Sequence, residues 1–356
     1  MSPYPPPAPP PSTSFTTTRL NASTFLITED DVYSERPFIY AKLHPHHPLL
    51  ILSDSGCAAP RDPSLSLTCL RTYLETYPVP CNRGRPLNPL SGEGATAGRA
   101  EREYLVICTH CHYDHIGALE QFAPTPTATA RATVLASSRG RKFVEEDLPT
   151  HSLCRARVPL PLAAVVRAGC CHSTLCRCRC HCGAQLDITV LHTPGHTPDE
   201  LAWYDAAERR LYVGDSLYER GAHGMPIIFP REGEWVDFLA SLAKMLDFVR
   251  ARNAEAGDAA GVADECVLVP GRVRVACAHA TSDVDAEEIL LAVAALFAAI
   301  LHGRVPVVES VEHRGEVVDL WMEDTGEGEE EVRFSVRAPR RLCEVARERL
   351  GLRRTA

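Results

Sequence analysis

A short apolar segment of this chain leads directly into a run of side chains that carry nitrogen and oxygen donors. The apolar segment is residues 104–107, and residues 109–115 read Thr-His-Cys-His-Tyr-Asp-His. In an extended or tightly turning backbone, side chains two positions apart share a face, so His110 and His112 point the same way. The carboxylate and the third imidazole begin the next turn and can face a second ion. Four donors at this spacing predict a two-metal site at the end of a strand.

The overall composition is that of an ordinary globular protein. The chain has 356 residues, of which 45% are hydrophobic and 23% charged, enough to bury a large core in one domain or two. Its formal charge of −9 and pI near 5.9 argue against a broad nucleic-acid surface, because such a surface needs a basic stripe to displace counterions from phosphates. We therefore expect a small-molecule substrate and no nucleic-acid partner.

Three features bear on the compartment. The N-terminus lacks a basic start followed by an apolar segment, which predicts no secretory signal. The longest apolar run, residues 289–301, is shorter than the roughly 20 residues that span a bilayer, and it predicts a buried helix instead of a membrane span. The 15 cysteines of a large chain without a signal are typical of reduced thiols or metal ligands. The cytosol is the expected compartment, and the oligomeric state is left open.

Proline marks the N-terminal limit of the predicted fold. Residues 1–14 are rich in proline and cannot bury enough apolar surface to order themselves, so we expect an extended tail. A main domain is predicted over residues 15–320, with a cysteine-rich insert at about 168–183. Residues 321–356 are expected to form an acidic loop and a helix that pack on this domain.

Strand and helix patterns alternate along the predicted domain. Apolar and β-branched runs predict strands at 16–27, 38–43, 49–52, 104–107, 132–136, 186–191, 200–204, 210–213, 267–269 and 273–276, and a hairpin within 305–320. Helical spacing predicts helices at 64–77, 116–122, 139–146, 234–252, 285–301 and 339–350. Two halves of mixed strands flanked by helices predict an α/β fold, a four-layered αβ/βα sandwich of two mixed β-sheets with the helices outside.

Further donor residues lie where predicted strands end. The sequence reads His-Thr-Pro-Gly-His-Thr-Pro at 192–198, Gly-Asp-Ser-Leu-Tyr at 214–218 and Cys-Ala-His-Ala-Thr at 277–281. Loops at strand ends are where rigid scaffolds carry chemistry. These three segments are therefore candidates to complete the site that residues 109–115 begin.

This series of motifs resembles the metallo-β-lactamase superfamily of metallohydrolases. The order HxHxDH, TPGHT, GDSLY and a late strand-end His is similar to that family over roughly residues 15–311. Residues 50–56 resemble its first motif, whose Asp, here Asp54, supports the site without being a regular ligand. The glyoxalase II and acyl-homoserine lactonase branch is the most similar. The resemblance implies the same αβ/βα sandwich.

The resemblance also implies a ligand set for two metal ions. The implied ligands are His110, His112 and His196 for the first ion, Asp114, His115 and His279 for the second, and Asp215 as a bridge. Two Zn²⁺ ions per chain are expected, with iron or manganese as alternatives. Zinc lowers the pKa of bound water to about 7, so a metal-bridging hydroxide is the implied nucleophile. Asp114 is then the residue that holds or shuttles the proton.

His279 departs from the family pattern. The last His of the family usually follows Pro-Gly, whereas Pro270-Gly271 is followed here by Arg272. If His279 were not a ligand, the site would hold one ion tightly and the other weakly.

Tyr218 is a second catalytic candidate beside Asp114. It lies three residues after Asp215, and this Asp-x-x-Tyr arrangement is similar to that of acyl-homoserine lactonases. The resemblance implies that its hydroxyl donates to a developing oxyanion or to the leaving oxygen. In the alternative, Tyr218 is a core residue that packs beneath residues 227–229.

Other cysteines and histidines receive structural interpretations. The alternating cysteines from Cys170 to Cys182 suggest either a structural zinc site or a thiol-rich loop, and the missing two-to-four residue gaps favour the loop. Cys108 and Cys111 are predicted to be small buried side chains. His192 is expected to pack or donate a hydrogen bond, and His223 and the histidines at 44–47 are assigned no role.

The predicted function is a metal-dependent hydrolase that cleaves a carboxylic ester, lactone or thioester of a small acyl substrate. Three alternatives remain: a one-iron protein similar to persulfide dioxygenases, a nuclease of the same superfamily, and a metal-binding protein without catalysis. The identity of the acyl group lies in loop geometry that the sequence does not specify.

Overall fold

The computed structural model describes residues 10–91, 98–125, 128–153, 175–179, 185–260, 271–323 and 332–352. These residues group into two units. The first unit holds the described residues up to Cys108 together with His112–Leu135. The second unit holds Thr109–Cys111 and the described residues from Ala136 onward.

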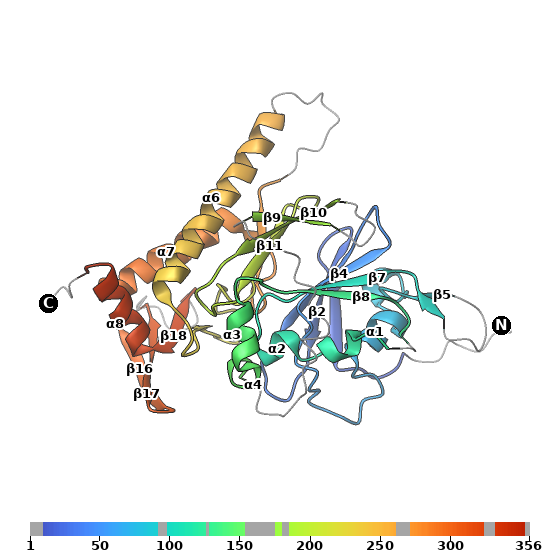
Figure 1. The fold of residues 1–356 in the computed structure, drawn as a ribbon, viewed down its shortest axis with the longest axis horizontal. Coiled ribbons are helices and arrows are strands. Elements are labelled where there is room, and N and C mark those ends of the chain that lie inside the picture. The colour runs from blue at the N-terminus through green and yellow to red at the C-terminus, as the bar shows by residue number, and fades with distance from the viewer. Residues whose placement is uncertain are drawn as a thin grey trace. The chain divides into compact units, whose positions relative to one another are not determined.

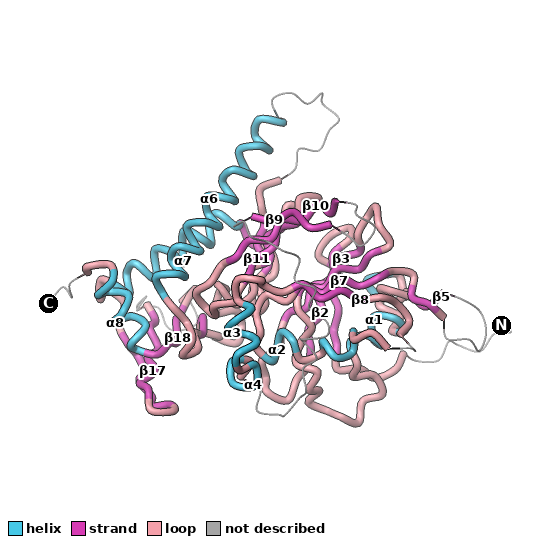
Figure 2. Tube along the Cα trace, in the orientation of Figure 1, coloured by secondary structure: helices cyan, strands magenta, loops and turns pink. Residues whose placement is uncertain are grey.

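A mixed six-stranded sheet forms the centre of the first unit (Figures 1 and 2), with the strand order β1-β2-β3-β4-β7-β8. The strands are β1 (Phe15–Arg19), β2 (Thr24–Glu29), β3 (Phe38–Leu43), β4 (Leu49–Ser53), β7 (Glu103–Ile107) and β8 (Ala132–Leu135). β1 to β4 pair antiparallel, whereas β4, β7 and β8 run parallel. Every residue of β4 is buried, which is typical of a strand in the parallel part of a sheet.

Short helices and a two-stranded ribbon complete the first unit. They are α1 (Leu70–Thr76), the 3₁₀ turns η1 (Pro80–Asn82) and η2 (Leu119–Phe122), α2 (Tyr113–Ile116), and the strands β5 (Leu90–Ser91) and β6 (Arg99–Ala100). A buried polar network anchors α1: Nε of Arg71 and Oη of Tyr104, on β7, each lie 3.0 Å from Oε1 of Glu75. Since buried charges are tolerated when they are paired and hydrogen-bonded, this network fixes α1 against β7.

A second mixed sheet forms the centre of the second unit, with the order β15-β14-β12-β11-β10-β9. Its strands are β9 (Leu175–Arg179), β10 (Gln185–His192), β11 (Leu201–Asp205), β12 (Arg210–Tyr212), β14 (Arg274–Ala276) and β15 (Val284–Asp285). β12 and β14 are parallel, and the other pairs are antiparallel. The helices of this unit are α3 (Arg141–Glu146), α4 (Leu148–His151), α6 (Trp235–Ala260), α7 (Ala286–Leu301) and α8 (Arg340–Arg349).

The second unit also holds a four-stranded sheet in the order β13-β18-β17-β16. These strands are β13 (Ile227–Ile228), β16 (Val307–His313), β17 (Glu316–Met322) and β18 (Ser335–Pro339). An aromatic cluster joins this sheet to α6 and α7: the ring of Trp235 lies 4.9 Å from that of Phe297 and 5.4 Å from that of Trp321. One buried apolar cluster therefore includes both helices and strands of both sheets of this unit.

The predicted α/β class, with mixed sheets flanked by helices, is confirmed. β3 has the predicted bounds, because its nearly continuous apolar run marks a strand whose four central residues are buried. The strand predicted at 16–27 is instead two strands, since the side chain of Asn21 accepts the backbone N–H groups of Ser23 and Thr24 and turns the chain. The helix predicted at 64–77 begins only at Leu70, because the backbone N–H of Leu67 is already bonded to the carbonyl of Ser12.

Several predictions fall at the limits of the described chain. Three predicted segments lie outside the described residues: residues 1–9 of the tail, the strand at 267–269 and most of the cysteine-rich insert. β9 is the described part of that insert. Within the tail, Thr13 forms a bridge with Leu67. The boundary predicted at residue 320 falls inside β17.

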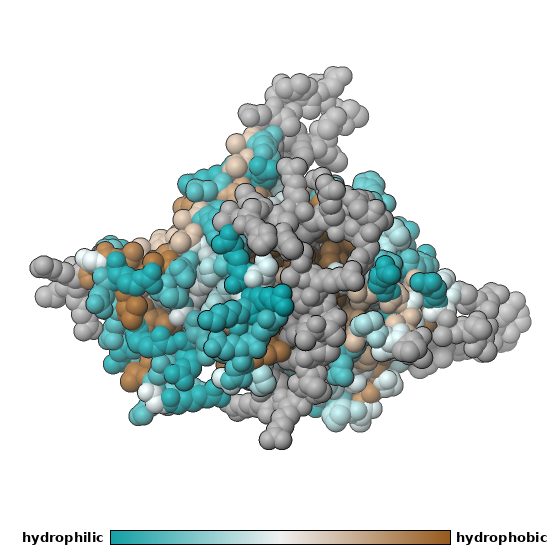
Figure 3. Space-filling model, in the orientation of Figure 1, coloured by the Kyte–Doolittle hydropathy of each residue, from teal (hydrophilic) through white to brown (hydrophobic). Residues whose placement is uncertain are grey.

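The side chains gathered over α3 and α4 are mostly hydrophilic (Figure 3), and neither helix contains a fully buried residue. Among the helices of the described chain, none combines the length and apolar character needed to cross a membrane.

Candidate metal centre

Three predicted ligands of the first unit lie at and after the end of β7. His112, Asp114 and His115 are all buried. His112 is the N-cap residue of α2 and has an extended backbone, while Asp114 and His115 lie inside the helix. Nε2 of His115 lies 3.2 Å from Oδ2 of Asp114. These two donors therefore come from consecutive residues of one short helix.

The loop after β4 holds both the ring and the backbone of His115. Oδ2 of Asp54 lies 3.1 Å from Nδ1 of His115, so this carboxylate accepts a hydrogen bond when Nδ1 carries the proton. Ser55 donates to the carbonyl of His115 from its backbone N–H and from its hydroxyl. The two loops meet because β4 and β7 are parallel neighbours that end at the same edge of the sheet. Asp54 therefore has the supporting contact that the sequence predicted.

The other four predicted ligands belong to the second unit and are buried there. His196 follows β10, Asp215 follows β12 and His279 follows β14. Oδ2 of Asp215 lies 3.9 Å from Nε2 of His110 and 3.7 Å from Nε2 of His196. Oδ1 of Asp215 lies 3.4 Å from Nε2 of His279. The two oxygens of one carboxylate therefore face different imidazoles.

Neighbouring oxygen atoms orient two of these imidazoles. Nδ1 of His196 lies 2.8 Å from the carbonyl oxygen of Ile228, to which it donates, and Nδ1 of His110 lies 3.2 Å from Oγ1 of Thr109. With Nδ1 engaged in this way, Nε2 is the nitrogen directed at Asp215. Contacts of this kind set the tautomer of a metal-binding histidine.

A buried glutamate supports the loop of Asp215. Oε1 of Glu200 accepts the backbone N–H of Asp215 at 3.1 Å. Gly214 has a φ of +56°, and a Cβ there would lie 2.8 Å from Oγ1 of Thr109 and 3.1 Å from Oε1 of Glu200. Both the conformation and the space require glycine. The sequence analysis missed Glu200; its signal is a carboxylate placed directly before the buried strand β11.

A buried acid and a buried thiol lie beside the first motif. Burial raises the pKa of Asp199 to about 6. Burial, together with the nearby Asp199 carboxylate, raises the pKa of the Cys111 thiol, which is therefore protonated at neutral pH. Cys108 is buried as well, so both cysteines have the burial that was predicted for them. Asp199 is a further residue that the sequence analysis missed.

Tyr218 is buried, and its hydroxyl is bonded to the backbone. The hydroxyl donates to the carbonyl of Pro226 at 2.9 Å and accepts the N–H of Ile228 at 3.2 Å. Its ring lies 5.7 Å from the ring of His279. These contacts match the alternative in which Tyr218 packs beneath residues 227–229. A catalytic role for the hydroxyl stays a prediction.

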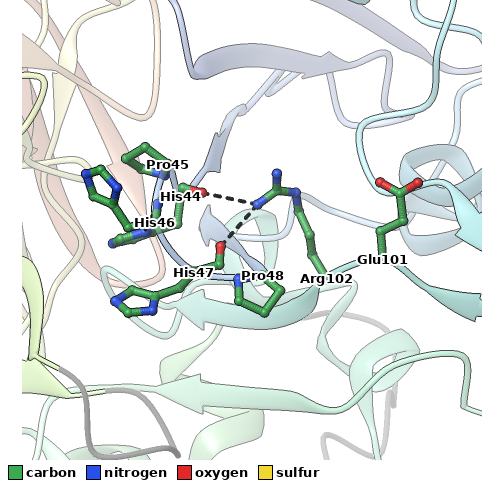
Figure 4. A pocket seen from close by; sticks show the side chains of 7 residues that line it. All are labelled: His44, Pro45, His46, His47, Pro48, Glu101 and Arg102. Atoms are coloured by element: carbon green, nitrogen blue, oxygen red, sulfur yellow. Dashed lines mark hydrogen bonds between the residues drawn. The ribbon is translucent and has the colours of Figure 1, made fainter.

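The histidines that follow β3 line a pocket of about 250 Å³ in the first unit (Figure 4). The lining residues are His44, Pro45, His46, His47, Pro48, Glu101 and Arg102. Nη1 of Arg102 donates to the carbonyls of His44 and His47, at 3.1 and 3.2 Å. The guanidinium thus stabilises the turn through its backbone, in keeping with the polar turn that was predicted.

His192 and His223, the other two histidines considered in the sequence, are not among the candidate ligands. Nε2 of His192 lies 3.0 Å from the carbonyl oxygen of Pro198, and burial lowers the pKa of this imidazole. The side chain of His223 is exposed.

The donors of each unit suit a transition-metal ion. Zinc binds imidazole and carboxylate at about 2.0–2.1 Å, and tetrahedral geometry then separates the donors by about 3.3 Å. The distances from Asp215 to the three imidazoles, 3.4 to 3.9 Å, are close to this value. In the second unit the ligand atoms of His110, His196 and Asp215 lie within 4.8 Å of one another, and the two donors of α2 are equally close in the first. Groups of His and Asp that can hold metal ions are therefore present.

Comparison with known proteins identifies several that are similar. No family model matches the chain. A putative transcription factor, avaE of Aspergillus versicolor, is 30% identical over 294 residues, which cover 83% of this chain and 78% of that protein. An acyl-coenzyme A thioesterase, MBLAC2 of Gallus gallus, is 25% identical over 162 residues, which cover 43% of this chain and 54% of that protein.

The solved structures that resemble this chain include a metallo-beta-lactamase from Pontibacter korlensis. It is 12% identical in sequence, with a TM-score of 0.47. The match covers 79% of this chain and 98% of that one.

Proposed function

We propose that the chain is a metal-dependent hydrolase of acyl thioesters in the metallo-β-lactamase superfamily, which its motif series resembles. The observation that carries the proposal is the arrangement around Asp215, whose two carboxylate oxygens face different imidazoles. Such a carboxylate suits a bridging position between two cations. The choice of a thioester over a lactone or a simple ester is supported by the relatives named acyl-coenzyme A thioesterase.

We assign the donors to two ions, which we propose to be zinc. The first would be held by His110, His112, His196 and Asp215, and the second by Asp114, His115, Asp215 and His279. When bound, the ions would polarise the substrate carbonyl and activate water near neutral pH. This assignment retains the donors that the motif series implied, including His279.

The residues of the chain have separate tasks in this proposal. Water adds to the carbonyl carbon of the thioester, the carbon–sulfur bond breaks, and the products are a carboxylic acid and a thiol. Asp114 takes the proton from water and passes it to the departing sulfur. Asp54 and the carbonyl of Ile228 hold His115 and His196 in the orientations that direct Nε2 toward the carboxylates. Glu200 holds the backbone of Asp215.

The avaE protein is named a putative transcription factor, which raises the different possibility of a role in transcription through contact with nucleic acid. The formal charge of −9 opposes it, because phosphate binding requires displacement of counterions by basic side chains. Donors for two ions likewise favour a binuclear hydrolase over a one-iron protein. We propose a cytosolic location, because the 15 cysteines of this large chain are typical of reduced thiols or metal ligands.

A substrate panel combined with metal analysis tests the proposal. The purified chain is expected to bind two zinc ions and to hydrolyse acyl-coenzyme A thioesters faster than lactones or phosphodiesters. The Asp114→Asn variant should lose this activity, and Asp247→Asn, which changes an exposed residue of α6, should keep it. Equal activity of both variants, or preferred cleavage of phosphodiesters, would reject the thioesterase proposal.

A further inference from the structure

Glu29, the last residue of β2, is a buried carboxylate outside the proposed ligand set. Its exposed fraction is 0%. Oε2 accepts the backbone N–H of Cys57 at 2.7 Å and that of Ala58 at 3.3 Å, and Oε1 accepts the N–H of Ala59 at 3.1 Å. A buried carboxylate is costly unless it is well hydrogen-bonded. Three donors from consecutive residues therefore tie Glu29 and the loop of residues 54–59 to each other.

The backbone of this loop is built around the carboxylate. Asp54, Gly56 and Ala58 have φ values of +63°, +79° and +50°. Alternate residues in the left-handed region turn successive N–H groups of the loop toward one side. A Cβ at Gly56 would lie 2.4 Å from Oε2 of Glu29, so the carboxylate occupies the space that a side chain would fill. Removal of the carboxylate would leave the N–H groups of residues 57–59 without this acceptor.

The same loop supports His115. Asp54 contacts the imidazole at 3.1 Å, and Ser55 binds the carbonyl of His115 twice. The fit on the other side is also close, because a Cβ at Gly117, two residues after His115, would lie 2.3 Å from the carbonyl oxygen of Cys57. A shift of the loop would therefore move the groups that orient His115.

We propose that Glu29 is a positioning residue for His115. Its carboxylate fixes the loop of residues 54–59, and the loop presents Asp54 and Ser55 to His115 so that Nε2 of the imidazole is directed toward Asp114. The consequence for metal binding rests on the proposed function, whereas the orientation of the ring does not. Loss of Glu29 should weaken the ion assigned to His115 and spare the ion assigned to His110 and His196.

Asp31 provides a matched control. It is also a buried acid with an exposed fraction of 0%, two residues after Glu29. Its side chain accepts the backbone N–H groups of Tyr33, Glu35 and Arg36, which belong to its own loop. A substitution of Asp31 therefore disturbs a buried carboxylate of the same hairpin without removing an acceptor of the loop of residues 54–59.

Cobalt titration of the full chain, followed by its visible absorption, tests the metal consequence. The wild-type protein should bind two equivalents. In Glu29→Gln, one nitrogen donor replaces an acceptor oxygen, so the second equivalent should bind about 10–100-fold more weakly and the first within about twofold of wild type. Asp31→Asn should retain both affinities. Parallel weakening of both equivalents in Glu29→Gln, or no weakening at all, would overturn the proposal.

A readout without metal separates this proposal from the proposed function. In the metal-free protein, NMR should detect a slowly exchanging Nδ1 proton of His115 in wild type and in Asp31→Asn, and a faster exchange in Glu29→Gln. If the wild-type protein binds no cobalt, the proposed function is wrong. The exchange rate of the Nδ1 proton of His115 still tests the role of Glu29 in that case. If Glu29→Gln does not fold, Glu29→Asp, which keeps the charge but shortens its reach, replaces it in both measurements. Unchanged exchange in a folded variant refutes the positioning role.

Discussion

The two units supply their donors in different ways. In the first unit, residues 112–115 lie next to one another in the chain, and the start of α2 is enough to bring Asp114 and His115 together. In the second unit, three of the four donors, His196, Asp215 and His279, follow β10, β12 and β14, so the sheet must form in the correct register before these three meet. A local arrangement depends on few contacts, whereas a non-local one depends on many. Substitutions in the second unit should therefore have the wider effects.

The largest effect is expected from Asp215→Asn. Asp215 contacts three imidazoles of the second unit, and the amide replaces one acceptor oxygen by a donor. We expect the affinity for each ion to fall by more than the 10–100-fold that outer partners of metal ligands contribute. Metal analysis after dialysis measures this. Retention of two ions would contradict the bridging role of Asp215.

Asp114→Asn is expected to affect the donors of the first unit and to leave those of the second unit unchanged. Turnover should fall by about 10²–10⁴-fold, as for the loss of a general acid or base, while the ion assigned to His110 and His196 is retained. Steady-state kinetics and metal content of the same preparation give both values. Loss of both ions would show that donors of the first unit are not independent of those of the second.

The buried acid of the first unit should make stability depend on pH. Burial raises the pKa of Glu29 from 4.5 to about 7, so the folded state holds this proton more tightly than the unfolded state. The stabilisation is complete below pH 4.5 and is lost as the pH rises toward 7, by at most about 3 kcal/mol. Chemical denaturation of the metal-free protein between pH 5 and 8 should show this loss in wild type. A parallel loss in Glu29→Gln would assign it to another group.

Glu200→Gln tests the corresponding support in the second unit. Glu200 accepts the N–H of Asp215, and the amide can keep this bond only through its single remaining oxygen. We expect both ions to bind about tenfold more weakly, because Asp215 is assigned to both. The same cobalt titration measures this. If only one ion bound more weakly, Glu200 would act on a single ion, as Glu29 is expected to do in the first unit.

The smallest effect is expected from Tyr218→Phe. The hydroxyl of Tyr218 supports Ile228, whose carbonyl orients His196. Loss of this indirect support should lower turnover of thioesters and of lactones by the same factor, about two- to fivefold, because one neutral hydrogen bond contributes about 1 kcal/mol. Turnover rates of wild type and Tyr218→Phe on a thioester and a lactone with the same acyl chain test this expectation. A much greater loss for the lactone would support the catalytic role that was predicted for the hydroxyl.

Local patterns account for what the sequence predicted well. The α/β class and β3 follow from the pattern and length of apolar runs, and the metal-binding character of the HxHxDH motif follows from the spacing of its own side chains. The later candidate ligands were predicted from a resemblance. The local sequence of residues 192–198 and 277–281 does not indicate which strands become neighbours in the sheet. The convergence of His196 and His279 on Asp215 is a property of the sheet.

The supporting acids could not be predicted from local pattern. Glu29 binds N–H groups of residues 57–59, and Glu200 binds that of Asp215, so each partner lies well beyond the reach of a helix or turn. A glutamate at a strand end is normally exposed, and only its tertiary surroundings reveal burial. The helix predicted at 64–77 failed for a related reason, since residues of the N-terminal segment bind the backbone at its predicted start.

The order of the donors along the chain also has a consequence for biosynthesis. His279 follows His115 by roughly 160 residues, and ribosomes add about 5–20 residues per second, so roughly 10–30 s separate the appearance of these two imidazoles. During that interval the nascent chain carries the donors of the first motif without His279. Under the proposed assignment, the second site is therefore incomplete until translation has passed β14, and a metal ion can be captured there only after nearly the whole domain has been made.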